Sequence, residues 1–142
     1  MRTPLYTVNR WEAAVSETAK TILIVDDANL VRLYYRSILE PLGYTIEEAL
    51  NGLEALEKLL VKPVDLLIVD VNMPQMDGVT FLTALRRQPL PISGTPALVI
   101  STESGAQDRD MAIAAGANFY LTKPAQPEAL KTYAALLCGV AA

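Results

Sequence analysis

The chain has 142 residues, with 12 basic and 16 acidic side chains, a net charge of -4 and no histidine. This length predicts one domain with a substantial hydrophobic core. The acidic balance argues against a nucleic-acid surface, because phosphate binding needs a concentrated basic patch. The single cysteine, Cys138, excludes an internal disulfide and favours a reducing compartment, and no apolar run is long enough to span a membrane. We therefore expect a cytoplasmic protein without a membrane segment.

Residues 1–20 differ from the rest of the chain because they show no strand pattern. Apolar and small residues between Trp11 and Thr18 fall at helical spacing. This segment is therefore either a short helix or a flexible N-terminal extension. We place the folded domain at residues 21–142.

From Thr21 onward, apolar runs typical of buried strands alternate with segments of helical periodicity. The predicted strands are residues 22–25, 44–48, 66–69, 97–100 and 118–121. The predicted helices are residues 28–39, a second after Asn51, a third after Asp77, residues 106–115, and a fifth from about Pro127. Five successive βα units predict an α/β fold, in which an open, doubly wound parallel sheet has helices on both faces. We expect the flavodoxin-like strand order 2-1-3-4-5.

Several helix ends carry recognisable signals. Asn51 can cap the second helix, with Glu54 completing a capping box, and Asp77 can cap the third. Gly116 suits the end of the fourth helix. The apolar faces expected on two of these helices are Leu53, Leu56 and Leu60 on the second, and Val79, Leu82 and Leu85 on the third.

Three carboxylates stand where predicted strands end. Asp26 and Asp27 follow the first strand, and Asp70 follows the third. Ligands of open parallel sheets bind at the carboxyl ends of strands, where the strand order reverses, and these two strands flank that point. Carboxylates at close range repel one another. A divalent cation such as Mg²⁺, which prefers oxygen ligands, would remove that repulsion.

Two further strands end on residues that suit a phosphoryl group. Thr102 offers a hydroxyl after the fourth strand, and Lys123 offers an ammonium group after the fifth. Asp70 is then a candidate nucleophile that would form an aspartyl phosphate. Simpler explanations exist for single residues, namely helix caps at Asp27 and at Thr102 or Ser104, and an exposed loop position for the lysine. The joint arrangement at four strand ends favours a site.

The motifs VDD, DVNMPQMDG, ST and KP occur in the order and spacing of a known family. Over about residues 21–138 the chain resembles a response-regulator receiver domain, in particular the stand-alone, CheY-like kind. The resemblance implies that Asp70 is the phosphoacceptor. It also implies a Mg²⁺ (or Mn²⁺) site formed by Asp26, Asp27, Asp70 and the backbone carbonyl of Asn72.

The same resemblance assigns the remaining site residues. Lys123 would bind the phosphoryl group, and Thr102 would swing toward it. Tyr120 would be the aromatic residue that turns inward together with the threonine. A cis peptide bond between Lys123 and Pro124 is implied as well.

The implied function is that of a phosphorylatable receiver in a two-component signalling system, of which chemotaxis is one form. It would not be an enzyme, apart from self-catalysed phosphotransfer and dephosphorylation. The chain contains no histidine and so cannot itself supply a phosphohistidine. The phosphoryl donor would be a histidine kinase or a small phosphodonor. A target protein would bind the fourth helix, fifth strand and fifth helix of a monomer or weak dimer, with no nucleic acid or membrane partner.

Some features depart from the family or leave alternatives open. Glu103 stands where the family normally has Ala or Gly, and Ala125 stands where it often has Phe. The alternatives are a non-phosphorylated receiver-like scaffold, a receiver fragment of a larger regulator, and an enzyme of the haloacid-dehalogenase type. That enzyme would need an acid at the position of Asn72. Arg32 and Arg36, one turn apart, either contact a kinase or form a solvated helix face.

Overall fold

The computed structural model describes residues 19–140, which contain one five-stranded parallel sheet in the order β2-β1-β3-β4-β5. The strands are β1 (Thr21–Val25), β2 (Thr45–Ala49), β3 (Leu66–Val69), β4 (Ala97–Ser101) and β5 (Phe119–Thr122). The helices are α2 (Asn29–Leu39), α3 (Gly52–Val61), α4 (Gly78–Arg86), α5 (Ala106–Ala115) and α6 (Pro127–Cys138), with short 3₁₀ turns η1 (Glu40–Leu42) and η2 (Ile92–Gly94). The predicted fold and strand order are confirmed. The predicted extension lies, apart from residues 19 and 20, outside the described residues.

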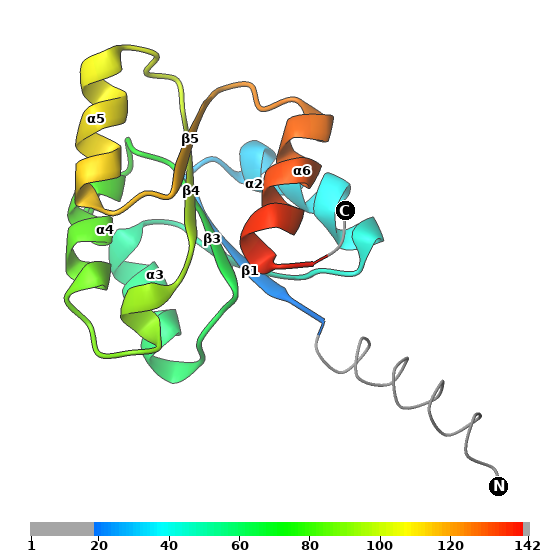
Figure 1. Cartoon of the computed structure of the whole chain (residues 1–142), viewed down its shortest axis with the longest axis horizontal. Coiled ribbons are helices and arrows are strands. Elements are labelled where there is room, and N and C mark those ends of the chain that lie inside the picture. The colour runs from blue at the N-terminus through cyan, green and yellow to red at the C-terminus, as the bar shows by residue number, and fades with distance from the viewer. Residues whose placement is uncertain (1–18, 141–142) are drawn as a thin grey trace, which may run out of the picture.

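Two helix layers enclose the sheet, with α2 and α6 on one face and α3, α4 and α5 on the other (Figure 1). Successive strand residues point to opposite faces. Ile22 and Ile24 of β1 therefore enter the core under α2 and α6, whereas Leu23 and Val25 enter the core under the other three helices. Burial on both faces explains why residues 22–25 of β1 and the whole of β3 are apolar.

The helix ends largely follow the sequence signals. Asn51 Oδ1 accepts a hydrogen bond of 2.9 Å from the Glu54 N–H, which confirms the cap of α3. The Glu54 carboxylate accepts from the Leu50 N–H at 3.0 Å instead of closing a capping box on Asn51. Asp77 caps α4 by accepting from the Thr80 N–H at 2.8 Å.

The predicted apolar face of α3 is wrong for two of its three residues. Leu53 and Leu60 are exposed, and only Leu56 packs, partly buried, against the core. The residues that the helix buries are Gly52, Ala55 and Leu59. These three residues have the same helical spacing as the predicted set, displaced by one position, so periodicity alone could not distinguish the two faces. The small residues are favoured because α4 packs closely there: a Cβ on Gly52 would lie 2.7 Å from the Cβ of Phe81 in α4.

The predicted inner face of α4 is confirmed in part. Leu82 and Leu85 are fully buried, whereas Val79 is half-buried. Phe81, which the sequence analysis left out, is one of the largest fully buried side chains. A helix covered by α3 on one side and α5 on the other buries a wider stripe than a surface helix does.

Candidate functional site

The three acidic residues meet at one edge of the sheet because β1 and β3 are paired neighbours. Val25 is opposite Val69 in the parallel register, so Asp26 and Asp70 leave the two strands side by side. The Asp70 N–H donates to the Val25 carbonyl at 2.9 Å. One carboxylate oxygen from each of Asp26, Asp27 and Asp70 lies within 4.8 Å of the others. We call these residues, together with Lys123, the acidic pocket.

Lys123 reaches into the acidic pocket from the end of β5. Its Nζ lies 2.9 Å from Asp26 Oδ2 and 3.4 Å from Asp70 Oδ1, and only 16% of the side chain is exposed. The Lys123 N–H donates to the Ser101 carbonyl at 2.7 Å, and the Lys123–Pro124 peptide is cis, as the resemblance implied. The alternative of an exposed loop lysine is therefore wrong.

The charges of the acidic pocket perturb one another. Burial raises the pKa of Asp70, and the charge of Asp26 raises it further, while Lys123 opposes both effects. For Lys123, burial lowers the pKa, but the hydrogen bond and charge of Asp26 and the charge of Asp70 outweigh it, so the pKa is raised. The single ammonium group of Lys123 thus does not balance the negative charge of the three carboxylates. A bound cation would be stabilised in this pocket.

The capping alternatives for single residues are also wrong within the described residues. The N-cap residue of helix α2 is Ala28, and no side chain, including that of Asp27, makes a capping hydrogen bond there. Helix α5 begins after Gly105, again without a side-chain cap, so Thr102 and Ser104 do not cap it. Asp27 and Thr102 therefore remain available for other contacts.

The end of β4 and the aromatic residue of β5 lie on one hydrogen-bonded path. Tyr120 is 8% exposed, so its side chain is turned inward, and its hydroxyl donates to the Glu103 carbonyl at 2.5 Å. Arg109 of α5 places its guanidinium carbon 5.9 Å from the centre of the Tyr120 ring. The Glu103 N–H donates to Ser101 Oγ at 3.1 Å. Thr102 lies between Ser101 and Glu103 and is exposed. Within residues 19–140, its hydroxyl makes no hydrogen bond.

A divalent cation fits the donor set of the acidic pocket. Asp27 is exposed, and within the described residues its carboxylate has no hydrogen-bond or ion-pair partner. Both oxygens of Asp26, in contrast, already accept from the Ala28 N–H and Lys123. Mg²⁺ takes one or two carboxylates and keeps several waters, so Asp27 and Asp70 suffice as charged ligands. Asn72 lies two residues beyond Asp70 in an exposed position.

One contributor to the site, Gly78, escaped the sequence analysis, and a second, Arg32, was given another role. Gly78, the last residue of the DVNMPQMDG motif, packs on the loop that carries Asp70: its N–H donates to the Val71 carbonyl at 2.8 Å, and a Cβ there would collide with the Asp70 backbone. Arg32 is buried instead of solvated, and both Arg32 and Arg36 bind Glu48. Only the glycine inside the motif could have signalled such a role.

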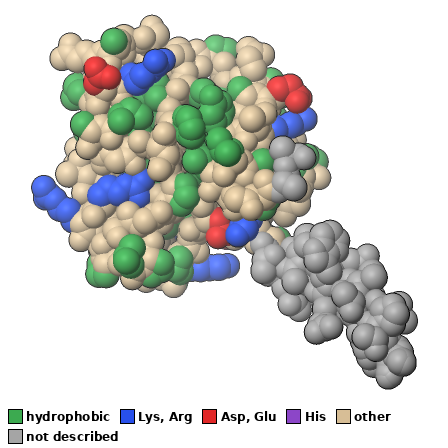
Figure 2. Space-filling view, in the orientation of Figure 1, with side chains coloured by type: hydrophobic (Ala, Val, Ile, Leu, Met, Phe, Trp, Pro, Cys, Tyr) green, Lys and Arg blue, Asp and Glu red, His purple; other side chains and the backbone are tan. Residues whose placement is uncertain are grey.

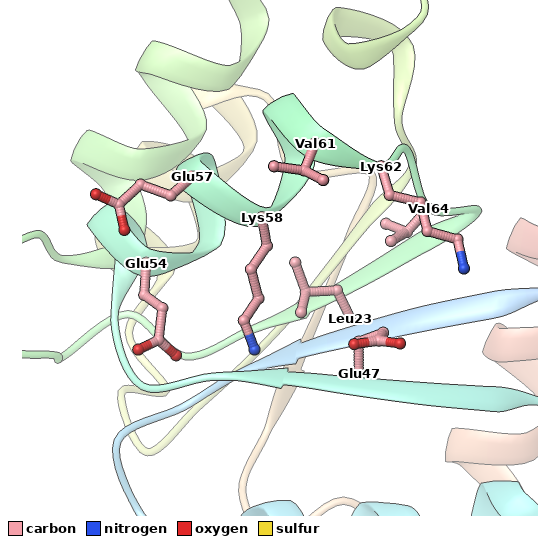
Figure 3. A pocket seen from close by; sticks show the side chains of 8 residues that line it. All are labelled: Leu23, Glu47, Glu54, Glu57, Lys58, Val61, Lys62 and Val64. Carbon is pink, nitrogen blue, oxygen red and sulfur yellow. The ribbon is translucent and has the colours of Figure 1, made fainter.

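A separate cavity of about 530 Å³ lies on the α3 side of β2 (Figure 3). Glu54, Glu57 and Lys58 of α3 line it together with Glu47 of β2, among others. Acidic, basic and apolar side chains line it together, and the Lys58 ammonium is bound to the Glu48 carbonyl. None of the acidic-pocket residues reaches this cavity, so it is distinct from the candidate site.

Comparison with known proteins identifies the class that this fold and pocket define. The response regulator receiver domain family matches residues 22–135, and the chain belongs to that family. It is 36% identical to the chemotaxis response regulator CheY4 of Vibrio cholerae, whose structure superposes with a TM-score of 0.78 over 84% of this chain and 99% of that one. A receiver domain of a histidine kinase from Syntrophus aciditrophicus is 33% identical, with a TM-score of 0.79 over 85% and 91%.

Curated relatives include parts of much longer proteins. The chain is 40% identical over 123 residues to the sensor protein EvgS of Escherichia coli K12, covering 85% of this chain and 10% of EvgS. It is 37% identical over 113 residues to the sensor histidine kinase CheAY of Helicobacter pylori, covering 78% of this chain and 14% of CheAY. The chain thus corresponds to a small part of either protein.

The family membership establishes the general role. Receiver domains of two-component systems are signalling proteins, in general not enzymes, that accept a phosphoryl group on an aspartate from histidine kinases. This assignment argues against the haloacid-dehalogenase alternative. Within residues 19–140, no helix combines the length and apolar character needed to cross a membrane.

Proposed function

We propose that Asp70 is the phosphoacceptor of this receiver and that Asp27, Asp70 and the Asn72 carbonyl hold Mg²⁺ beside it, with Asp26 assisting. The observation that carries the proposal is the meeting of three carboxylates within 4.8 Å, with Lys123 Nζ 3.4 Å from Asp70. Among the three acids, Asp70 combines burial at the end of β3 with direct contact to a lysine that can bind an incoming phosphoryl oxygen. When bound, Mg²⁺ neutralises the charge that gathers on the phosphoryl oxygens.

The reaction is a displacement at phosphorus. An Asp70 carboxylate oxygen forms the new P–O bond as the bond from phosphorus to the donor breaks, and the donor keeps the electron pair. A phosphohistidine of a kinase and acetyl phosphate are donors of this type. Lys123 stays protonated and follows the transferred oxygens, and hydrolysis of the aspartyl phosphate by water resets the protein.

Phosphorylation would act on the rest of the molecule through Thr102 and Tyr120. The added negative charge and acceptor oxygens attract the Thr102 hydroxyl and Lys123. Because Glu103 follows Thr102 directly and its carbonyl binds the Tyr120 hydroxyl, movement of the threonine loop changes the support of the inward tyrosine. This path leads from the acidic pocket to α5 and β5.

The proposed target surface is formed by α5, β5 and α6. Figure 2 shows hydrophobic side chains gathered between α5 and α6, over β5. Phe119 is 37% exposed and packs against Tyr133 of α6 with ring centres 4.8 Å apart, while Met111 and Ile113 are exposed on α5. We propose that a target protein binds this face, and that the chain acts in the cytoplasm as a monomer or weak dimer.

Intact mass spectrometry after incubation with acetyl phosphate and Mg²⁺ tests the phosphoacceptor. We expect one phosphoryl adduct on the wild type and none on Asp70→Asn. An undiminished adduct on Asp70→Asn would overturn the assignment. Binding of beryllofluoride in the presence of Mg²⁺, followed by NMR, separates a working pocket from a non-phosphorylated scaffold, which would not bind it.

A further inference from the structure

Two arginines of α2 share one glutamate of the neighbouring edge strand. Arg32 Nε lies 2.6 Å from Glu48 Oε1, and Arg36 reaches Glu48 Oε2 with Nη2 at 2.6 Å and Nε at 3.0 Å. Arg36 also pairs with Glu40. Glu48 points toward α2 because it alternates with Glu47, which faces the cavity under α3. We call Arg32, Arg36, Glu40 and Glu48 the Glu48 cluster.

Among the contacts of residues 19–140, Arg32 is the one member of this cluster that reaches the acidic pocket. Its Nη1 donates to the backbone carbonyl of Asp26 at 2.6 Å, and its Nη2 reaches Asn29 Oδ1 at 3.2 Å. The residue is only 7% exposed. Arg36 binds the same glutamate but has its remaining contacts with the Ile46 carbonyl and Glu40. The two arginines therefore share a partner and differ in whether they touch the pocket.

The contact fixes the residue on which the pocket is built. Asp26 is held through its N–H by the Ala49 carbonyl at 3.1 Å and through Oδ1 by the Ala28 N–H at 2.9 Å. Lys123 holds Oδ2 at 2.9 Å, and Arg32 holds the carbonyl oxygen. That carbonyl belongs to the peptide that leads into Asp27. The direction of the exposed Asp27 carboxylate therefore depends on a backbone group that Arg32 anchors.

Charge alone does not explain the arrangement. The two guanidinium groups of the cluster face two carboxylates, so its charges balance. What Arg32 adds is geometry, since its planar fork binds Glu48, Asn29 and the Asp26 carbonyl at once. A lysine would keep the positive charge but lack the planar guanidinium group that binds three partners at once.

We propose that Arg32 is a positioning residue for the divalent cation, holding the Asp26–Asp27 backbone so that Asp27 can ligate beside Asp70. The proposal rests on the proposed function, because it presumes that the acidic pocket binds Mg²⁺. Residues outside the ligand shell that orient metal ligands typically change metal affinity by about 10- to 100-fold when replaced. The competing role is a purely structural tie between α2 and β2, which Arg36 would share.

The test measures the Mg²⁺ affinity of three variants by isothermal titration calorimetry. In each experiment, the metal-free protein is titrated with Mg²⁺ alone. Arg32→Met removes charge and fork, Arg32→Lys removes only the fork, and Arg36→Met removes a partner of the same glutamate. Thermal unfolding in EDTA records the stability of each variant separately. We expect both Arg32 variants to bind Mg²⁺ about tenfold more weakly than the wild type, and Arg36→Met to bind it with unchanged affinity despite a lower Tm.

The outcomes are distinct. Unchanged Mg²⁺ affinity in a folded Arg32→Lys protein would overturn the proposal, as would equal weakening in Arg36→Met. If Arg32→Met does not fold, the lysine variant and Arg36→Met still decide. A wild type that does not bind Mg²⁺ at all would instead overturn the proposed function.

Discussion

The acidic pocket and the Glu48 cluster meet at Asp26, whose carbonyl binds Arg32, and they differ in how far their charges are balanced. In the cluster, each arginine meets a carboxylate, and the hydrogen-bonding groups are paired. In the pocket, one lysine faces three carboxylates, and the pKa of Asp70 is raised mainly by burial and then by its acidic neighbours. The Glu48 cluster, in which the charges are balanced, supports the fold. The acidic pocket carries excess negative charge and is stabilised only when a ligand supplies positive charge.

The largest effect is expected at the one cation of the pocket. Lys123→Met should lower the rate of phosphorylation by acetyl phosphate by about 100-fold, because it removes a donor directed at the transferred oxygens. Intact mass measured against time checks this result. Lys131→Met, on the exposed face of α6, is the matched control and should leave the rate unchanged. A Lys123→Met protein that reacts at the wild-type rate would contradict the placement of the lysine.

In the Glu48 cluster, removing charge should destabilise the protein. Glu48→Gln should lower the free energy of unfolding by about 2 kcal/mol at pH 7, because two guanidinium groups lose their shared carboxylate. Although burial acts to raise the pKa of Glu48, the bonds to Arg32 and Arg36 outweigh it, so the pKa is lowered from 4.5.

The lowered pKa fixes the pH dependence of this variant. A carboxylate with a depressed pKa contributes stability above its unfolded pKa, and this stability is lost as the pH falls through the folded value. The cost of Glu48→Gln should therefore be complete at pH 7 and shrink below about pH 4.5. Urea unfolding at both ends of this range measures it. A cost that persists unchanged in acid would show that the ion pairs are not its cause.

In the acidic pocket, removing charge should have the opposite sign. Asp70→Asn should raise the Tm by a few degrees at pH 7 in EDTA, because the ionised Asp70 is disfavoured in the folded protein. The raised pKa means that the wild type loses stability as the pH rises, so the gain should vanish below the ordinary pKa of 3.8. Saturating Mg²⁺ should also reduce the gain by stabilising only the wild type. A lower Tm for Asp70→Asn at pH 7 would contradict the comparison.

The fold was predictable because strands buried on both faces leave a strong sequence signal. The runs at residues 22–25 and 66–69 are apolar throughout, and the structure has strands there. The inner face of α3 was not predictable, because the spacing of Gly52, Ala55 and Leu59 equals that of three leucines one position along. Choosing between them requires knowing how closely α4 approaches.

The site also combines residues that the sequence predicts with one whose role it does not predict. Asp26, Asp27, Asp70 and Lys123 follow strands directly, so the parallel register brings them together once the strand order is known. For Arg32, a solvated helix face was one of the two predicted roles. The local sequence does not show that this side chain binds the Asp26 carbonyl and Glu48, which is sixteen residues away. Contacts of this kind follow from tertiary packing, not from a motif.

The smallest effect is expected at Glu103, in the loop that follows β4. Glu103 is exposed and follows Thr102, and its contact with Tyr120 uses the backbone carbonyl, which an alanine retains. Glu103→Ala should therefore keep the tyrosine in place while removing one negative charge from the approach of an anionic donor. We expect phosphorylation by acetyl phosphate to become about twofold faster at low salt, with the difference lost at high ionic strength. Glu57→Ala, on the exposed side of α3, is the control, and a salt-independent change in Glu103→Ala would indicate altered loop geometry instead of charge.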